Sequence, residues 1–467
     1  MQEIISEFEK LTRIPRPSGH EEKVSEYLEN RAKELGFPVI RDAQNNIVFD
    51  IPATKGMEEK PLVGLQAHMD MVFAQKDGGN LDPLTTCIAM KNDGKDLTAD
   101  GTSLGADDGI GIAMILCIAE GKMEHGPLRA IITTGEEVSM GGAQGLDPAM
   151  LEGVSYLINI DSEEEGHVTV SSAAGVTTHF TKYGNPEKPG MEKAWKISLL
   201  GLSGGHSGVD IDKNRLNAVT GLGKALQEAG PLAVASMKGG SADNAIPTSA
   251  EAVICMAESD VEVLRSILQS QLDAHKISDP DGKYSIEETG MPREVMEASL
   301  QKALLGLCCH IRDGCLVMSS DVDGLVQTSS NLGILQADAK MIRATGLARS
   351  SDPLDLQDLC DSFSCLSEEN GMEYKPDFTA EAWKFNPESR LLKITKEAYH
   401  RLFGKEISVD AIHAGLECGC FMTKNPALDI ISIGATLRNP HTVREACEIE
   451  SIGKVWNLLE EILRRAE

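Results

Sequence analysis

Hydrophobic positions predict two helices at the start of the chain. Apolar residues recur every three or four positions, first at Ile4, Ile5, Phe8 and Leu11. The same spacing returns after Ser18–Glu21, a stretch with the spacing of a capping box. The first 35 residues therefore predict a pair of amphipathic helices.

Short apolar runs then alternate with helical patterns. A helical pattern covers Gly109–Ala119. The runs that predict buried strands are Leu62–Ala67, Leu128–Thr134, Tyr156–Ile160 and Ile430–Ile433. This alternation is typical of an α/β fold in which a mostly parallel sheet carries helices on both faces.

The middle of the chain predicts a separate domain. Gly184–Gly190 is rich in glycine and proline and is interpreted as a linker, and a second linker is placed near Trp383–Ser389. Between them we expect an α+β unit with strands at Trp195–Leu200 and Ala250–Met256 and a helix at Val261–Ala274. We therefore predict a first domain of residues 1–182 and 386–467, interrupted by an inserted domain of residues 183–385.

Composition and charge narrow the possible partners. Of the 467 residues, 44 are Lys or Arg and 72 are Asp or Glu, so the formal net charge is 44 − 72 = −28. Such a surface repels nucleic acid and anionic membranes. The N-terminus lacks the basic start and apolar core of a secretion signal, so we expect a cytoplasmic protein. The 11 cysteines form no C-x-x-C pair and predict neither a disulfide framework nor a structural zinc knot.

Candidate chemistry begins where the first strand ends. His68 and Asp70 lie two residues apart and point to one face of the strand, an arrangement that is often only a structural hydrogen bond. Asp107 and Asp108 begin the helix at Gly109–Ala119. Capping requires one acid at most, so one of the two is free to bind a cation.

Two further strands also end in acidic residues. Glu136 and Glu137 follow Leu128–Thr134, and Asp161 follows Tyr156–Ile160. Ligand sites in open α/β sheets lie outside the carboxyl ends of the strands. Because like charges that converge there need a cation to hold them together, this pattern favours a metal site.

The candidate ligands suit zinc, manganese or cobalt. One imidazole and four carboxylates come from His68, Asp70, Asp107, Glu137 and Asp161. A second imidazole is available at His441, just after the last strand, which would allow two divalent ions bridged by one carboxylate. Such a pair lowers the pKa of a bridging water and polarises a carbonyl, and Glu136 is left as the general base.

The motifs HMDMV, LGADDGIG, TTGEE, NIDSEEEG, GGHSG, NAIP, HAGLECG and PH resemble those of the co-catalytic zinc peptidases of the M20 superfamily. The resemblance is most specific to the aminoacyl-histidine dipeptidases, the bacterial carnosinase-like branch, and runs over essentially the whole chain. It implies hydrolysis of Xaa-His dipeptides by attack of a metal-bound hydroxide on the peptide carbonyl. The partner is then a small peptide, and the inserted domain is a lid that also forms a homodimer.

The resemblance also implies individual roles. Asp107 would bridge the two metal ions, Asp70 would orient His68, and Glu136 would be the base. The remaining ligands divide into two pairs, His68 with Asp161 and Glu137 with His441.

Further residues take substrate roles by the same resemblance. His206 of the GGHSG motif would stabilise the tetrahedral oxyanion. Asn244 and Arg349 would contact the substrate's C-terminal carboxylate, and Gly415 and Glu417 would line the substrate pocket.

This sequence departs from the family's motifs at two places, and these differences leave the substrate preference open. Asp243 stands beside the NAIP motif where relatives often have Arg, and Thr442–Glu445 follows His441 where they often have Ser-Pro-x-Glu. Neither departure involves a proposed metal ligand. The alternative within the superfamily is a broader di- or tripeptidase or an N-acyl amino acid amidase.

Two other classes compete with a metallopeptidase. Gly201–Gly205 formally fits the G-x-S-x-G motif of serine hydrolases, but a nucleophile elbow needs a helix directly afterwards, and His206–Gly208 begins a helix poorly. A non-catalytic binding protein on the same fold would be expected to lack the base or a ligand, whereas all of these residues are present.

Overall fold

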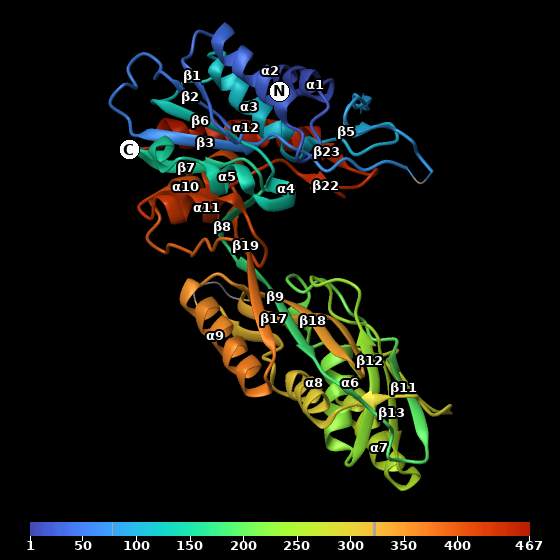
Figure 1. Cartoon of the computed structure of the whole chain (residues 1–467). Coiled ribbons are helices and arrows are strands. Elements are labelled where there is room, and N and C mark those ends of the chain that lie inside the picture. The colour runs from blue at the N-terminus through green and yellow to red at the C-terminus, as the bar shows by residue number, and fades with distance from the viewer. Residues whose placement is uncertain (77, 321–323) are drawn as a thin grey trace. The chain divides into compact units, whose positions relative to one another are not determined.

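The computed structural model describes residues 1–76, 78–320 and 324–467. Contacts divide the chain into two compact units: unit 1 holds Met1–Ser172 and Ala380–Glu467, and unit 2 holds Ala173–Thr379 (Figure 1). Unit 2 begins before the boundary placed at residue 183, because the strand Ala174–Tyr183 (β9) pairs along its whole length with a strand of unit 2. The chain therefore passes between the units inside extended backbone and not inside a glycine-rich linker.

Unit 1 is built on an eight-stranded sheet in the order β1-β2-β6-β3-β7-β21-β8-β20. The central pairs β6-β3, β3-β7 and β7-β21 are parallel, while β1 and β2 form an antiparallel edge. The prediction of a mostly parallel α/β sheet is thus confirmed. The strands are β1 Val39–Arg41, β2 Ile47–Ile51, β3 Leu62–His68, β6 Leu128–Thr133, β7 Val154–Asn159, β8 His167–Ser172, β20 Ser408–Ile412 and β21 Asp429–Ser432.

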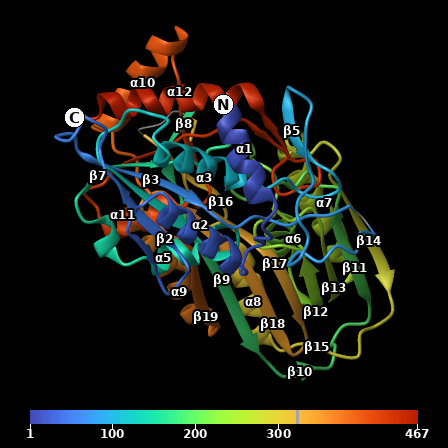
Figure 2. The ribbon, with the colours of Figure 1, turned by 90° about the horizontal axis from the view of Figure 1, so that it is seen from above.

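Both faces of this sheet are covered. Neighbouring strand residues point to opposite faces, so that Ile132 and Ile158 join one apolar core while Ile131 and Leu157 join another. Helices α1, α2, α3, α10 and α12 pack on the first face, and α5 and α11 on the second (Figures 1 and 2). Their bounds are α1 Gln2–Thr12, α2 Glu22–Glu34, α3 Ala106–Ala119, α5 Gly141–Gly145, α10 Arg390–Phe403, α11 Glu417–Lys424 and α12 Ile449–Arg465, with a one-turn α4 at Glu136–Ser139.

A smaller antiparallel sheet completes unit 1. Its order is β22-β23-β5-β4, so it joins a segment near the C-terminus to one that precedes α3. The strands are β4 Met90–Asn92, β5 Asp96–Ala99, β22 Leu437–Arg438 and β23 Ala446–Glu448. This pairing fixes both ends of the loop that carries His441.

Unit 2 is the expected α+β domain. Its main sheet runs β14-β11-β13-β12-β17-β18-β9-β19, with β16 paired to β17, and the registered pairs are antiparallel. The remaining strands and helices are β10 Pro186–Glu187, β11 Ala194–Leu200, β12 Leu232–Gly239, β13 Ala250–Met256, β14 Lys283–Thr289, β15 Val295–Met296, β16 Gly314–Met318, β17 Val326–Asp338, β18 Met341–Ser350, β19 Glu373–Ala380, α6 Ala218–Glu228, α7 Glu258–Ala274, α8 Ala298–His310 and α9 Pro353–Asn370.

The second predicted linker is wrong at its start. Trp383 is only 1% exposed and packs in the core beneath α11. Its backbone also exchanges two hydrogen bonds of 3.0 Å with Ser172, where the chain first leaves unit 1. The two crossing segments are therefore tied together inside unit 1, which a composition signal cannot reveal.

Two further observations concern the cysteines and the length of the helices. All eleven cysteines lie in the described part of the chain and are free thiols, and most of them are buried. Among the described residues, every helix is too short or too polar to cross a membrane.

Gly434 is the position where the fold leaves no space for a side chain. A Cβ there would lie 1.6 Å from the carbonyl oxygen of Ser162, directly after Asp161. Because backbone blocks the space, we expect Gly434→Ala to lower the apparent melting temperature by a few degrees. A Cβ at Gly190 meets nothing within 4 Å, so Gly190→Ala is the matched control. Equal melting temperatures of the two variants in a thermal scan would contradict this packing.

Candidate metal centre

The carboxyl ends of three parallel strands bring the candidate residues together. His68 ends β3, Glu137 lies in α4 just after β6, and Asp161 follows β7. The pairing of His68 with Thr133 and of Gln66 with Asn159 puts these ends at one edge of the sheet.

Asp107 lies at the centre of this group. One carboxylate oxygen, Oδ1, is 2.9 Å from Nε2 of His68, and the other, Oδ2, is 3.0 Å from Nε2 of His441. His68 Nε2 is also 3.4 Å from Asp161 Oδ1, and His441 Nε2 is 2.8 Å from Glu137 Oε1. Each oxygen of Asp107 therefore faces a different pair made of one imidazole and one carboxylate.

These donor sets fit divalent cations. Ligand atoms of His68, Asp107 and Glu137 all lie within 4.8 Å of one another. Imidazole nitrogen with carboxylate oxygen is a combination that zinc, manganese and cobalt accept. The residues present could hold two ions, one on each side of Asp107.

Several ionisable side chains of the centre have pKa values far from their ordinary ones. Burial raises the pKa of Asp161 to about 6 and that of Glu163 to about 7. Hydrogen bonds to Asp107 and Glu137 raise the pKa of His441 to about 11. The carboxylates thus hold protons on nearby groups, and a divalent ion bound between them would release such protons.

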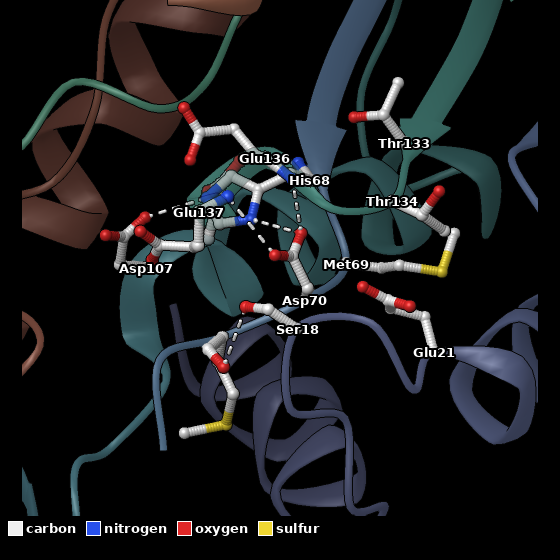
Figure 3. Close-up of polar contacts among 12 residues, drawn as sticks. Ser18, Glu21, His68, Met69, Asp70, Asp107, Thr133, Thr134, Glu136 and Glu137 are labelled. Atoms are coloured by element: carbon white, nitrogen blue, oxygen red, sulfur yellow. Dashed lines mark hydrogen bonds and ion pairs between the residues drawn. The ribbon is translucent and has the colours of Figure 1, made fainter. Parts of the chain in front are cut away.

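Asp70 connects His68 to α4. Its Oδ1 lies 3.3 Å from His68 Nδ1, on the side of the ring away from Asp107. The same carboxylate accepts hydrogen bonds from the backbone N–H of Glu136, at 3.0 Å, and of Glu137, at 3.3 Å (Figure 3). Asp70 therefore fixes both the orientation of an imidazole and the start of the helix that carries the acid pair.

Glu136 stands beside the group that Asp107 connects. Among the residues drawn in Figure 3, no dashed contact ends on its carboxyl oxygens, whereas those of Asp70 and Asp107 are engaged. Burial, the largest effect, raises the pKa of Glu136 well above its ordinary value. Its carboxyl therefore lies beside the centre and holds its proton more strongly than an ordinary glutamate does.

The two adjacent acids at α3 divide their tasks. Asp107 and Asp108 have non-helical backbone angles, so the regular helix begins after them. Asp108 Oδ1 accepts a hydrogen bond from Gly111 N at 3.1 Å and its Oδ2 accepts one from His68 N at 3.3 Å. The prediction that one acid serves the helix is confirmed for Asp108.

Sequence reasoning missed two buried charged residues that hold the loops of the centre. Glu445, 3% exposed, accepts hydrogen bonds from all three backbone N–H groups of Leu104–Ala106, at 2.7 to 3.0 Å. Arg16, 1% exposed, donates to the carbonyl oxygens of Met69, Asp70 and Gly105. Glu445 could have been found from its place just after His441, but no local pattern marks Arg16.

Unit 2 brings its own candidate residues near one another. The His206 loop pairs with the NAIP segment, and Ser207 N donates to the carbonyl oxygen of Asn244 at 2.8 Å. Burial and the positive charge of Arg349 lower the pKa of His206. Asp243 in turn acts electrostatically on Arg349, so the reversed charge noted in the sequence lies close to that guanidinium.

The serine hydrolase alternative finds no support at Ser203. Its hydroxyl donates a 2.6 Å hydrogen bond to the carbonyl oxygen of Ser278. The residues after it form a loop and the short 3-10 helix Ile211–Lys213, not the helix of a nucleophile elbow.

Gly415 and Glu417 differ from each other in their surroundings. Gly415 is half-buried, and a Cβ there would lie 2.7 Å from the Met140 side chain. Glu417 is fully buried and accepts 2.6 Å hydrogen bonds from Gln66 and Thr133. Glu417 has no exposed surface in this structure, and its place in the wall of the substrate pocket stays a prediction.

Comparisons with known proteins agree on one family. Residues 64–465 match the profile of peptidase family M20/M25/M40. The cytosol non-specific dipeptidase of Escherichia coli (strain K12) is 34% identical over 471 residues, which cover 98% of this chain and 96% of the relative.

Solved structures show the same fold. The aminoacylhistidine dipeptidase from Vibrio alginolyticus superposes with a TM-score of 0.93 at 31% identity, over 99% of this chain and 96% of that one. A tripeptidase from Staphylococcus aureus has a TM-score of 0.58 at 17% identity, over 99% and 97% of the two chains, and shares the fold alone.

The geometry around Asp107 predicts the effect of a metal on stability. We expect zinc added to chelator-treated protein to raise the melting temperature, because an ion at 100 times its Kd stabilises the folded state by about 2.7 kcal/mol. Asp107→Asn should lose most of this rise, since both imidazole pairs face its oxygens. Asp50→Asn, at an exposed carboxylate on β2, is the control that should keep it. A full rise in the Asp107 variant would place the ions elsewhere.

Proposed function

The chain belongs to peptidase family M20/M25/M40, and from this premise we propose that it is a di-metal dipeptidase that hydrolyses Xaa-His dipeptides. The observation that carries the proposal is the position of Asp107, which offers one carboxylate oxygen to His68 with Asp161 and the other to His441 with Glu137. The proposed cofactors are two divalent ions, with zinc as first choice and manganese or cobalt as alternatives.

Glu136 is the proposed general base. When bound, two such ions would lower the pKa of a water molecule and polarise a peptide carbonyl. The Glu136 carboxylate takes a proton from the attacking water and then passes it to the nitrogen of the leaving amine. Asp70 supports this step because it holds the backbone of Glu136 and the ring of His68 in place.

His206 is proposed to stabilise the oxyanion. Its Nδ1 accepts hydrogen bonds from the backbone N–H groups of Gly208, at 3.1 Å, and Val209, at 3.2 Å. A neutral ring with an accepting Nδ1 carries its proton on Nε2, where it can be donated. The lowered pKa of His206 favours that neutral form.

Substrate recognition is proposed for three other residues. Asn244 and Arg349 are assigned to the C-terminal carboxylate of the peptide, and Gly415 to the wall of the pocket. The names of two similar proteins differ on specificity, since one is called non-specific and the other aminoacylhistidine. Asp243, which acts on Arg349, is a feature of this chain that bears on that choice.

Cellular setting and assembly complete the proposal. The curated relative is named a cytosol enzyme, which supports a cytoplasmic location. A homodimer formed through unit 2 follows from the resemblance of the whole chain to the aminoacyl-histidine dipeptidases.

A matched substrate panel tests the proposed specificity. We expect the zinc- or manganese-loaded protein to release amino acids faster from β-Ala-His and Leu-His than from Leu-Leu, Gly-Gly-Gly or an N-acetyl amino acid. Equal or faster cleavage of Leu-Leu would favour a broad dipeptidase. Preference for the tripeptide or the N-acetyl compound would instead favour a tripeptidase or an amidase.

The role of Glu136 predicts a separation of activity from metal content. Glu136→Gln removes the base and keeps the shape of the side chain, so kcat should fall by about 10²–10⁴-fold. Metal content per chain, measured by elemental analysis, should stay near that of the unchanged protein because Glu136 is not a proposed ligand. Near-normal turnover in this variant would contradict the assignment.

A further inference from the structure

A chain of buried hydrogen bonds crosses the central strands next to the candidate metal centre. Asn159 donates from Nδ2 to Gln66 Oε1, and Gln66 donates from Nε2 to Glu417 Oε2, both at 2.6 Å. Thr133 donates to the same Glu417 oxygen, also at 2.6 Å. All four side chains are fully buried. One oxygen of Glu417 is thus the shared acceptor at the end of the chain.

Each strand residue that takes part in these hydrogen bonds lies just before a residue of the candidate metal centre. Gln66 is two positions before His68 on β3, and Asn159 is two positions before Asp161. Thr133 ends β6, directly before the turn into the helix α4. Because side chains two apart on a strand point to one face, these contacts lie on the face that carries the proposed ligands.

Glu417 is the nearest acceptor for both donors, at 2.6 Å, whereas the other acceptor near the Thr133 hydroxyl, the carbonyl oxygen of Ala67, lies 3.4 Å away. The two protons on Gln66 Nε2 are directed at Glu417 Oε2 and, at 3.0 Å, at the hydroxyl of Thr133. The Thr133 hydroxyl then has its own proton for Glu417. Without an acceptor at residue 417, one proton of Gln66 would be left unpaired in a buried region and the Thr133 hydroxyl would keep only the carbonyl oxygen of Ala67, at 3.4 Å. Such a loss is costly because water cannot replace the lost partner.

We propose that Glu417 is a positioning residue for the metal centre, which sets the spacing of β3, β6 and β7 through Gln66, Thr133 and Asn159. It acts through these strands and not by contact with the substrate. The inference rests on the proposed function, because the positions that it controls are those of the proposed ligands.

Two variants test whether Glu417 acts as a hydrogen-bond acceptor. Glu417→Gln is a close mimic, because it keeps the size of the side chain and its amide oxygen can accept both hydrogen bonds. Glu417→Leu has a similar size but no acceptor. The pair separates loss of the acceptor from loss of volume.

The experiment compares zinc affinity and kinetics for these two variants. Zinc affinity is measured by competition with a chromophoric chelator, and kcat and KM are measured on Leu-His with the metal-saturated enzyme. We expect Glu417→Leu to weaken zinc binding by about 10–100-fold and to lower kcat, with KM within about twofold of the unchanged protein. Glu417→Gln should bind zinc with an affinity within about threefold of the unchanged protein, because it still accepts both hydrogen bonds. This change is smaller than the loss expected when such a support is removed.

A control separates positioning from general destabilisation. Leu28→Ala truncates a fully buried residue on α2, away from the hydrogen-bond chain. It should lower the melting temperature and leave zinc affinity unchanged. If Glu417→Leu lowers the melting temperature but binds zinc like the Leu28 variant, the side chain is only structural and the inference is overturned.

Two further outcomes also contradict the inference. A raised KM with unchanged zinc affinity in Glu417→Leu would return Glu417 to the wall of the substrate pocket. A Glu417→Gln variant as impaired as Glu417→Leu would show that charge, and not hydrogen-bond acceptance, is what matters. The unchanged protein separates a failure of the proposed function from a failure of the inference about Glu417. If the unchanged protein neither binds zinc nor cleaves Leu-His, both fail together.

Discussion

The convergence of carboxylates around Asp107 is the constraint on which the rest of unit 1 depends. Glu137 and Asp161 follow parallel strands and so lie at the same edge of the sheet. Asp107, at the start of α3, lies near both of them. In a buried setting such charges repel one another unless cations lie between them. Here His68 and His441 occupy the positions between the acids, and the same donors suit divalent ions. The shape of the site therefore follows from a need for positive charge.

The surrounding structure holds this unfavourable arrangement in place. Asp70 accepts a hydrogen bond from the start of α4, and Glu445 accepts one from the loop before Asp107. Arg16 donates hydrogen bonds both to that loop and to the segment after β3. Each of these contacts joins a charged side chain to backbone, so loop positions are set by hydrogen bonds that packing alone does not provide. The chain that ends at Glu417 applies the same principle to the strands. Rigid support of this kind is what a metal site with defined geometry requires.

Much of the site could be predicted from sequence because its signals are local. Strand ends, the acid pairs after them and the glycines around Asp107 can all be recognised within a few residues of one another. The supporting contacts are different, since Glu417 and Gln66 are 351 positions apart and Glu445 lies 340 positions from Gly105. Their partners become known only when the fold brings them together. For the same reason the sequence predicts a linker at Trp383, although this residue belongs to the core.

The proposed centre would hold two divalent ions, one on each side of Asp107. Anomalous diffraction from crystals of the zinc-loaded protein, collected at the zinc absorption edge, locates such ions. We expect two peaks roughly 3.5–4 Å apart, one next to His68 and Asp161 and the other next to His441 and Glu137. A single peak, or peaks away from Asp107, would overturn this arrangement.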